Sequence, residues 1–396
     1  METSNLRRAT WFSATVVAAS LLGAAACSSS STSSSASASP STGKSSGSAS
    51  ASAGTSSGGL AASQIVQATT LKHSFQPNGK GAAMTESLSQ PDDIVALAGN
   101  LYVGFQNGVG SQGEASTSGN LDSTLAEFTS AGSLVKQWDV TGKIDGMGAD
   151  AATGQVLATV NEDSKSSLYA VSGGTVTHYT YHPSLPHLGG TDAIAVYQGK
   201  ILVTASAPGT SGKAPASAPA VYAVTLNAGA KTAGVTSLFA DNAKATEVVG
   251  GKMVSLALTD PDSNLVVPSG SPEFAGDFML NSQGDQELIF SGASSQGLKV
   301  LKISASVDDS AWATSASGKL YTTDSSADTI DVITGSFTPG TAYTAVTPCN
   351  ANSAPSTCPA PGYPANYLGT INLKTGAVGK VAFTGVLTPK GMVFVP

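Results

Sequence analysis

The sequence is poor in charge and in the side chains that most often hold metals. Asp, Glu, Lys and Arg together make up only 11% of the 396 residues, and there are four histidines and three cysteines. The formal net charge is -7, and no cluster of Lys and Arg occurs beyond the N-terminal segment. Nucleic acids and anionic lipid headgroups require a basic surface, so we expect neither as a partner.

The motifs of several large enzyme classes are also absent. The chain has no nucleophile elbow, no phosphate-binding P-loop, no zinc-binding helix motif and no dinucleotide fingerprint. No long amphipathic helix pattern occurs either. Any chemistry must therefore come from polar side chains that a β-rich fold gathers.

Residues 1–26 carry an export signal. Arg7 and Arg8 form a basic head, an apolar run extends from Trp11 to Leu22, and small residues lead into Cys27. The run is too short to span a membrane comfortably, which takes about 20 residues. The pattern resembles the lipobox of bacterial lipoproteins, which implies a lipid anchor on Cys27 and a location on the outer face of the cytoplasmic membrane or the cell surface. An ordinary cleaved signal peptide and an uncleaved anchor are the alternatives, and the paired arginines also allow a twin-arginine route.

Residues 27–62 are almost entirely Ser, Ala, Thr and Gly. Such a segment has too little apolar surface to offset the entropy lost on ordering, so we predict a disordered tether. The expected organisation is a signal peptide at 1–26, the tether at 27–62 and one domain at 63–396.

Cys349 and Cys358 lie close together in a segment rich in Pro and Ala. Outside the cytosol such a pair is most simply a disulfide that closes one loop. A metal site would need histidines or further cysteines nearby, and the sequence has none there. We therefore predict a structural role.

The domain consists of short apolar runs separated by glycine turns. One unit recurs, made of an acidic start, a strand, a Gly turn and a second strand. It begins at Asp93, Asp145, Asp192 and Asp309. Two further strands follow most units, and the starts lie about as far apart as the ~40–50 residues of a propeller blade. The pattern predicts an all-β fold, a β-propeller of four-stranded blades, with a pair of β-sandwiches as the alternative.

We expect about six blades, with seven as the alternative. Asp277 resembles another blade start, and residues 387–394 resemble a last inner strand; a seventh blade would be built on residues 247–254. Residues 65–75 are expected to supply missing strands of the last blade and so close the ring. Residues 260–264 are expected to form a turn, because the Gly and Glu of a calcium-binding EF-hand loop are missing.

A family resemblance supports this fold. Residues 318–324 followed by 328–333 resemble the repeat of NHL-type and SMP-30/gluconolactonase-like propellers, and the region from 90 to 396 resembles actinobacterial secreted propeller lipoproteins. For the gluconolactonase-like enzymes, the resemblance implies a divalent metal held by Glu, Asn and Asp side chains on inner strands. The blade starts of this chain carry Asp and no matching Glu.

The candidate site is the mouth of the propeller channel, where the inner strands begin. We expect a ring of carboxylates there, formed by Asp93, Asp145, Asp192, Asp277 and Asp309. Such a ring suits calcium, another divalent cation or a polyhydroxylated ligand, and no other cofactor is expected. The alternative is that each Asp only accepts hydrogen bonds from the backbone of a turn.

Three further residues are candidates for the same mouth. His187, shortly before Asp192, is a candidate general base or metal ligand, although a histidine in a loop bounded by prolines can equally serve packing. Asn161 and Glu162 end an analogous hairpin and add an amide and a carboxylate.

Two functions remain open at this stage. We favour a monomeric, non-catalytic surface lipoprotein whose propeller binds a small molecule, a glycan or an envelope protein. The alternative is an exported metal-dependent enzyme, namely a lactonase or other hydrolase, a lyase or a sugar dehydrogenase, that uses the carboxylate ring.

Overall fold

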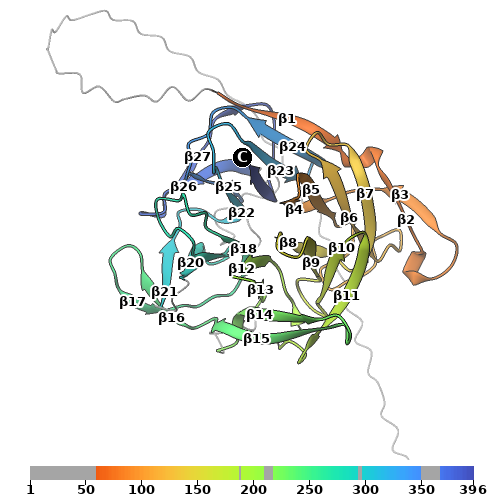
Figure 1. Ribbon diagram of the computed structural model, residues 1–396, viewed down its shortest axis with the longest axis horizontal. Coiled ribbons are helices and arrows are strands. Elements are labelled where there is room, and N and C mark those ends of the chain that lie inside the picture. The colour runs from red at the N-terminus through yellow and green to blue at the C-terminus, as the bar shows by residue number, and fades with distance from the viewer. Residues whose placement is uncertain (1–58, 187–188, 209–216, 293–296, 349–365) are drawn as a thin grey trace, which may run out of the picture. The chain divides into compact units, whose positions relative to one another are not determined.

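The computed structural model describes residues 59–186, 189–208, 217–292, 297–348 and 366–396 (Figure 1). The chain divides into two units, Met1–Gly54 and Thr55–Pro396, and all described residues belong to the second. Cys27, Cys349, Cys358 and His187 lie outside the described residues. No helical segment in the described part of the chain is long and apolar enough to cross a membrane.

The second unit is a β-propeller, and its described residues form six blades, numbered 1 to 6 in the order of their inner strands (Figure 1). Each inner strand adjoins the next, and the last adjoins the first. The inner strands are β4 (Pro91–Leu97), β8 (Ile144–Asp150), β12 (Ile194–Tyr197), β18 (Pro261–Val266), β22 (Val307–Trp312) and β29 (Met392–Val395). The predicted fold class is confirmed.

Blades 1, 2 and 3 are meanders in which each strand pairs with the next along the chain. Their other strands are β5 (Asn100–Phe105), β6 (Asp122–Thr129) and β7 (Leu134–Thr141); β9 (Gln155–Val160), β10 (Ser167–Ser172) and β11 (Thr175–His182); and β13 (Lys200–Thr204), β14 (Pro219–Asn227) and β15 (Thr232–Ala240). The outer strands β11 and β15 pair in parallel, so blades 2 and 3 share one sheet.

The hairpins predicted after Asp93, Asp145 and Asp192 are confirmed by these three blades. Two of the turns show why the sequence pattern was informative. Ala98 and Gly99 both have positive φ, as do Gln198 and Gly199. Two consecutive residues of that conformation form the tight turn that matches the twist of a two-stranded hairpin.

Blade 4 corrects three predictions. It contains β19 (Phe278–Ser282), β20 (Glu287–Ser291) and β21 (Leu298–Lys302), and a hairpin of β16 (Lys244–Glu247) and β17 (Met253–Ser255) extends its outer edge. Asp277 therefore precedes the second strand of a blade, and residues 247–254 contribute to an edge hairpin instead of a seventh blade. Residues 261–264 are the first four residues of the inner strand β18 and are no turn. Their polar residues are turn formers elsewhere, but an inner strand borders a channel, and proline is tolerated as the first residue of a strand.

Two strands of blade 6 lie between the strands of blade 5 along the chain, and the sequence pattern did not predict this order. Blade 5 pairs β22 with β25 (Ala342–Val346), β26 (Tyr367–Ile371) and β27 (Val378–Lys380). The intervening β23 (Lys319–Asp324) and β24 (Thr329–Thr334) belong to blade 6. The hairpin predicted from Asp309 through Gly318 is therefore wrong. A Cβ at Gly318 would overlap the ring of Phe394, so this glycine permits a close approach between segments where a hairpin turn was expected.

Blade 6 joins the two ends of the described chain. β1 (Leu60–Gln67) pairs with β24 and with β28 (Phe383–Thr384), while β29 forms the inner edge. The predicted closure by residues 65–75 is confirmed only for β1, since β2 (Lys72–Phe75) pairs with β3 (Met84–Ser87) in a separate sheet. Two short helical turns, η1 (Ala68–Thr70) and η2 (Pro77–Gly79), flank β2. β1 begins at Leu60, so residues 60–62 of the predicted tether are part of a strand.

The hydrophobic core consists of six clusters, one at each interface between neighbouring blades. At the closing interface, Val66 of blade 6 packs in the same cluster as Phe105 and Phe128 of blade 1. Every blade thus buries both faces of its sheet, which explains why many strands are apolar at successive positions.

Neighbouring inner strands come into close contact at Gly146, which directly follows Asp145. A Cβ at Gly146 would overlap the carbonyl oxygen of Asp192 in the next blade. We expect Gly146→Ala to lower the free energy of unfolding by about 1–3 kcal/mol, the usual cost of overpacking. Urea unfolding measures the change. Gly270→Ala is the control, since no atom lies within 4 Å of its ideal Cβ; equal losses in both variants would contradict this close packing.

Candidate functional site

The inner strands of four blades begin with a β-bulge at the same place. The register shifts between Pro91 and Ile94, between Ile144 and Met147, between Pro261 and Asn264, and between Val307 and Ser310. A bulge sets two adjacent residues against one on the partner strand and re-aims their side chains. The first residue inside each bulge is an aspartate, namely Asp92, Asp145, Asp262 and Asp308.

Hydrogen bonds place the remaining two blades in the same register. The hydroxyl of a threonine on the second strand accepts from Gly146 N at 3.2 Å in blade 2, from Ala193 N at 2.9 Å in blade 3 and from Gly391 N at 2.9 Å in blade 6. The residues before these three groups therefore occupy equivalent positions. Every blade contributes one charged side chain, and we call this set the charged ring: Asp92, Asp145, Asp192, Asp262, Asp308 and Lys390.

The charged ring lines one cavity of about 360 Å³ on the propeller axis. Glu162, in the loop after β9, lines the same cavity. Farther along the inner strands its wall is largely apolar, with Ile194, Leu265, Trp312 and Phe394 among the lining residues. The cavity thus has a charged zone and an apolar zone.

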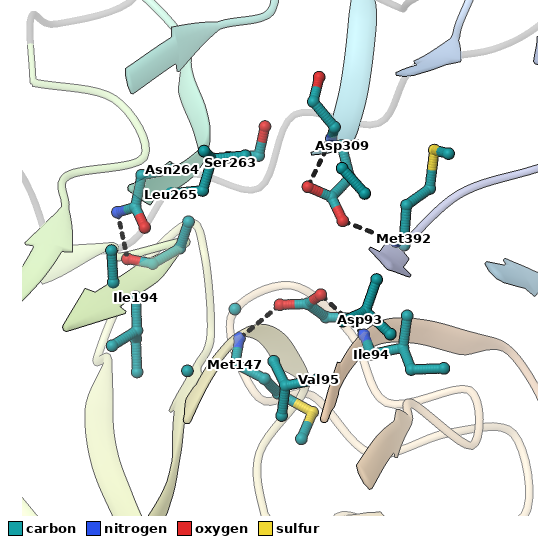
Figure 2. A pocket seen from close by; sticks show the side chains of 18 of the residues that line it. Asp93, Ile94, Val95, Met147, Ile194, Ser263, Asn264, Leu265, Asp309 and Met392 are labelled. Carbon is teal, nitrogen blue, oxygen red and sulfur yellow. Dashed lines mark hydrogen bonds between the residues drawn. The ribbon is translucent and has the colours of Figure 1, made fainter. Parts of the chain in front are cut away.

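Asp93 and Asp309 line this cavity but are used to join blades (Figure 2). Asp93 Oδ2 accepts a 2.6 Å hydrogen bond from Met147 N of blade 2, and Asp309 Oδ2 accepts a 2.6 Å hydrogen bond from Met392 N of blade 6. Their Oδ1 atoms accept from the N–H of the following residue. For these two residues the structure matches the alternative in which the carboxylate accepts from the backbone.

The other predicted residues are divided between the cavity and other places. Asp145 and Asp192 belong to the charged ring, and Glu162 joins them. Asn161 is buried, and its Oδ1 accepts from Lys143 N at 2.9 Å, so its amide supports the loop. Asp277 is not among the lining residues of this cavity, and Asp262 takes the place in the ring that the sequence assigned to blade 4.

Asp92, Asp262, Asp308 and Lys390 were not identified from the sequence. A signal existed for Lys390, because Lys390, Gly391 and Met392 align with Asp145, Gly146 and Met147. The change from an acidic to a basic residue hid this equivalence.

Two lysines neutralise one side of the charged ring. Lys390 forms an ion pair with Asp92, and Gln106 Nε2 donates to Asp92 Oδ2 at 2.8 Å. Lys143 Nζ lies 3.0 Å from Asp145 Oδ1 and 2.5 Å from Glu162 Oε1. Burial alone would lower the pKa of each lysine, but the neighbouring carboxylates outweigh it and raise the pKa of both.

The opposite side of the ring has no cation in direct contact, although the charge of Lys390 lowers the pKa of Asp308 and Asp262 from a distance. The carboxylates of Asp192, Asp262 and Asp308, which we call the open arc, form no hydrogen bond or ion pair within the described residues. These residues come from blades 3, 4 and 5, which are consecutive. The charged zone is therefore negative on the side of the open arc.

Burial and crowding raise the pKa of the carboxyls in this cavity. Burial raises the pKa of Asp145 to about 7 against the opposing charge of Lys143, and that of Asp308 to about 6 against Lys390. Burial, followed by neighbouring carboxylates, raises the pKa of Asp192 and Asp262 well above the ordinary value. Burial also raises the pKa of Asp309 to about 7. Negative charge in this cavity is therefore costly in the chain alone.

The described residues contain no group of three or more His, Cys, Asp or Glu side chains arranged to hold a metal ion. His187, the predicted general base or metal ligand, is outside the described residues. The divalent cation predicted from the acidic blade starts thus stays a prediction.

Comparisons with known proteins support the fold only. No protein-family model and no curated protein matches the chain. Similar solved structures include a protein of unknown function from Bacteroides caccae, with a TM-score of 0.43, 10% identity and coverage of 86% of this chain and 99% of that one. Streptogramin B lyase gives a TM-score of 0.38 at 10% identity, covering 83% and 93%. A luciferin-regenerating enzyme gives 0.34 at 14% identity, covering 69% and 88%.

The raised pKa values predict how stability depends on pH. In the folded chain, Asp145 and Asp309 have a pKa of about 7 and Asp308 of about 6, above the ordinary value of 3.8. The folded state therefore binds these protons more tightly, and the stability they contribute is complete below the ordinary value and is lost as pH rises through about 6 to 7. We expect an unfolding temperature at least roughly 4 °C higher at about pH 5 than at about pH 8, measured by calorimetry.

Asp308→Asn tests the origin of this effect. The variant removes one ionisation from the open arc, so we expect it to unfold at a higher temperature than wild type at about pH 8 and to show a flatter pH dependence. Asp163→Asn, which changes an exposed carboxylate outside the cavity, is the control. A pH dependence that is the same in all three proteins would contradict the assignment.

Proposed function

We propose that this chain is an exported lipoprotein whose β-propeller binds a ligand in its axial cavity. The observation that carries the proposal is the open arc. Asp192, Asp262 and Asp308 meet in one cavity, and the described chain supplies no direct partner for their carboxylates. Asp192, Asp262 and Asp308 are half-buried. A carboxylate that is partly removed from water without a partner costs free energy, so a ligand that offsets this cost explains why three blades carry them.

The ends at which three connections leave their blades support binding on this side. The connections after β5, β13 and β25 leave their blades at the end where the charged ring lies, because Phe105, Thr204 and Val346 pair at or beside the first residues of the inner strands. The turns at the opposite end, such as Ala98 with Gly99, contain few residues. Binding residues tend to occur on long loops held by a rigid scaffold.

We further propose that the protein is monomeric and that its ligand is a small molecule, with a glycan or an envelope protein as the alternative. Its kinship with NHL-type and SMP-30/gluconolactonase-like propellers is part of the same proposal. The metal-dependent enzyme remains the second prediction from the sequence. Propellers host unrelated functions, so the fold does not choose between them.

A thermal-shift screen tests ligand binding. We expect at least one compound from a set of sugars, amines, amino acids and divalent cations to raise the unfolding temperature of wild type by roughly 5 °C at a hundredfold excess over its Kd. The same compound should fail on Asp192→Asn and succeed on Asp277→Asn, which alters a carboxylate outside the cavity. No stabilising compound, or equal stabilisation of all three proteins, would contradict the proposal.

The lipid anchor is tested separately. Cys27→Ser should abolish incorporation of labelled palmitate and move the protein from the membrane fraction to the soluble exported fraction, because a thiol is needed for the thioether to the lipid. Cys349→Ser is the control and should keep the label. Labelling that persists in Cys27→Ser, or no labelling of wild type, would contradict the anchor.

A further inference from the structure

The open arc presents only hydrogen-bond acceptors to the cavity. The carboxylates of Asp192, Asp262 and Asp308 line it without a partner, and Asp262 Oδ2 is fully buried. On the other side of the ring, Lys390 and Lys143 already neutralise Asp92, Asp145 and Glu162. Trp312 Nε1 and Asp145 Oδ2 are further buried atoms of the lining without a hydrogen-bond partner, but the open arc is the part of the cavity that lacks a directly paired positive group with hydrogen-bond donors.

A neutral side chain beside the open arc points to the same requirement. Asn264 is only 9% exposed and lines the cavity between Ser263 and Leu265 (Figure 2). Its Nδ2 donates to the carbonyl oxygen of Ala193 at 3.1 Å, whereas its Oδ1 has no hydrogen-bond partner. Buried amide oxygens are almost always paired in proteins, so this atom marks the place of a donor from a bound molecule.

The apolar zone adjoins this acceptor set on the same strands. Ile194 begins β12 two residues after Asp192, Leu265 follows Asn264 on β18, and Trp312 ends β22. A bound molecule that satisfies the open arc thus has an apolar wall next to it. Ligand pockets commonly combine such a wall with a few fixed polar groups.

An ammonium group fits these acceptors. It carries one positive charge and three N–H donors, and both carboxylate and amide oxygens accept hydrogen bonds from such donors. A second positive charge on the ligand would be repelled by Lys390, which lines the same cavity, so the inference requires one cationic end only.

From this arrangement we infer that the cavity binds an amphipathic primary amine, whose ammonium group lies at Asp192, Asp262, Asn264 and Asp308 and whose apolar body lies against Leu265 and Trp312. The inference rests on the proposed function and names its ligand class. Because burial raises the pKa of Asp262 and raises that of Asp308 to about 6, a bound cation favours their ionised forms and releases the protons that they hold near pH 6.

Isothermal titration calorimetry of the full chain at about pH 6, where Asp308 is about half protonated, tests the inference with n-hexylamine as the probe. We expect one molecule to bind per chain, with an enthalpy that changes with the ionisation enthalpy of the buffer because protons are released. n-Hexanol lacks the charge and ammonium chloride lacks the apolar body, so each should bind at least about tenfold more weakly. A titration with calcium chloride tests the alternative hypothesis that the carboxylates of the open arc bind a metal ion.

Matched variants locate the site. Asp262→Asn should weaken hexylamine binding by about tenfold or more, and Asp277→Asn should leave it unchanged. Asp308→Asn gives a second removal from the open arc in case Asp262→Asn fails to fold, which a thermal unfolding curve shows. Hexanol that binds as tightly as hexylamine would overturn the inference, as would hexylamine binding that survives both Asp262→Asn and Asp308→Asn.

The ligand class and the proposed function fail in different ways. If hexylamine does not bind but another compound stabilises wild type and not Asp192→Asn, the amine is wrong and the binding function stands. Tight calcium binding that is lost in Asp262→Asn would likewise replace the amine with a metal ion. If no compound depends on the open arc, both are wrong.

Discussion

The structure depends on a set of polar links between neighbouring blades at the level of the charged ring. Thr159 of blade 2 donates to the carbonyl oxygen of Asp192, Thr323 of blade 6 to that of Asp92, and Asn281 of blade 4 to that of Asp308 at 2.9 Å. The other three interfaces use Gln106, Asn264 and Asp309. Every interface thus carries at least one such bond, and together they fix the main chain of the ring residues.

This bonding has an electrostatic consequence. When the main chain of Asp92, Asp192 and Asp308 is held at the inner edge of each blade, their side chains have few directions other than toward the axis. Carboxylates that sequence separates widely therefore share one cavity. In blade 6 the equivalent position holds Lys390, which reduces the repulsion between the carboxylates. An aspartate at this position would leave Asp92 without its ion pair. The fold thus neutralises one side of the ring with its own lysines, and the cationic ligand that we propose would neutralise the other.

The sequence predicts local hairpins better than it predicts which strands share a blade. Gly99 and Gly199 are informative because a tight turn needs their positive φ, and the turn settles the pairing of its two flanking strands. Gly318 looks the same in the sequence but serves a close approach to Phe394, so β22 and β23 part into different blades. Pairing between distant segments, such as β1 with β24, is set by the closure of the ring, which one local pattern cannot show.

The candidate site was predictable where an acidic residue opens a hairpin and not where the inner strand is polar. Asp145 and Asp192 precede recognisable hairpins, so they were found. Asp262 lies between Pro261 and Ser263, and these residue types are typical of turns. The strand after Asp277 is more apolar, so Asp277 was predicted as the start of the blade instead. The register that reveals the ring is carried by bulges and by threonine hydroxyls on the second strand, and a bulge has no sequence signature of its own.

The two ends of blade 6 give the cavity a direction relative to the chain. β1 runs antiparallel to β24, β24 to β23, and β23 to β29, so the start of β1 lies level with the end of β29. Ala62 and Phe394 accordingly share this level through Ile333 and Leu320. Lys390 precedes the other end of β29. β1 therefore begins at the end of blade 6 that is remote from the charged ring, so the first described residues of the chain do not lie at the mouth of the ring.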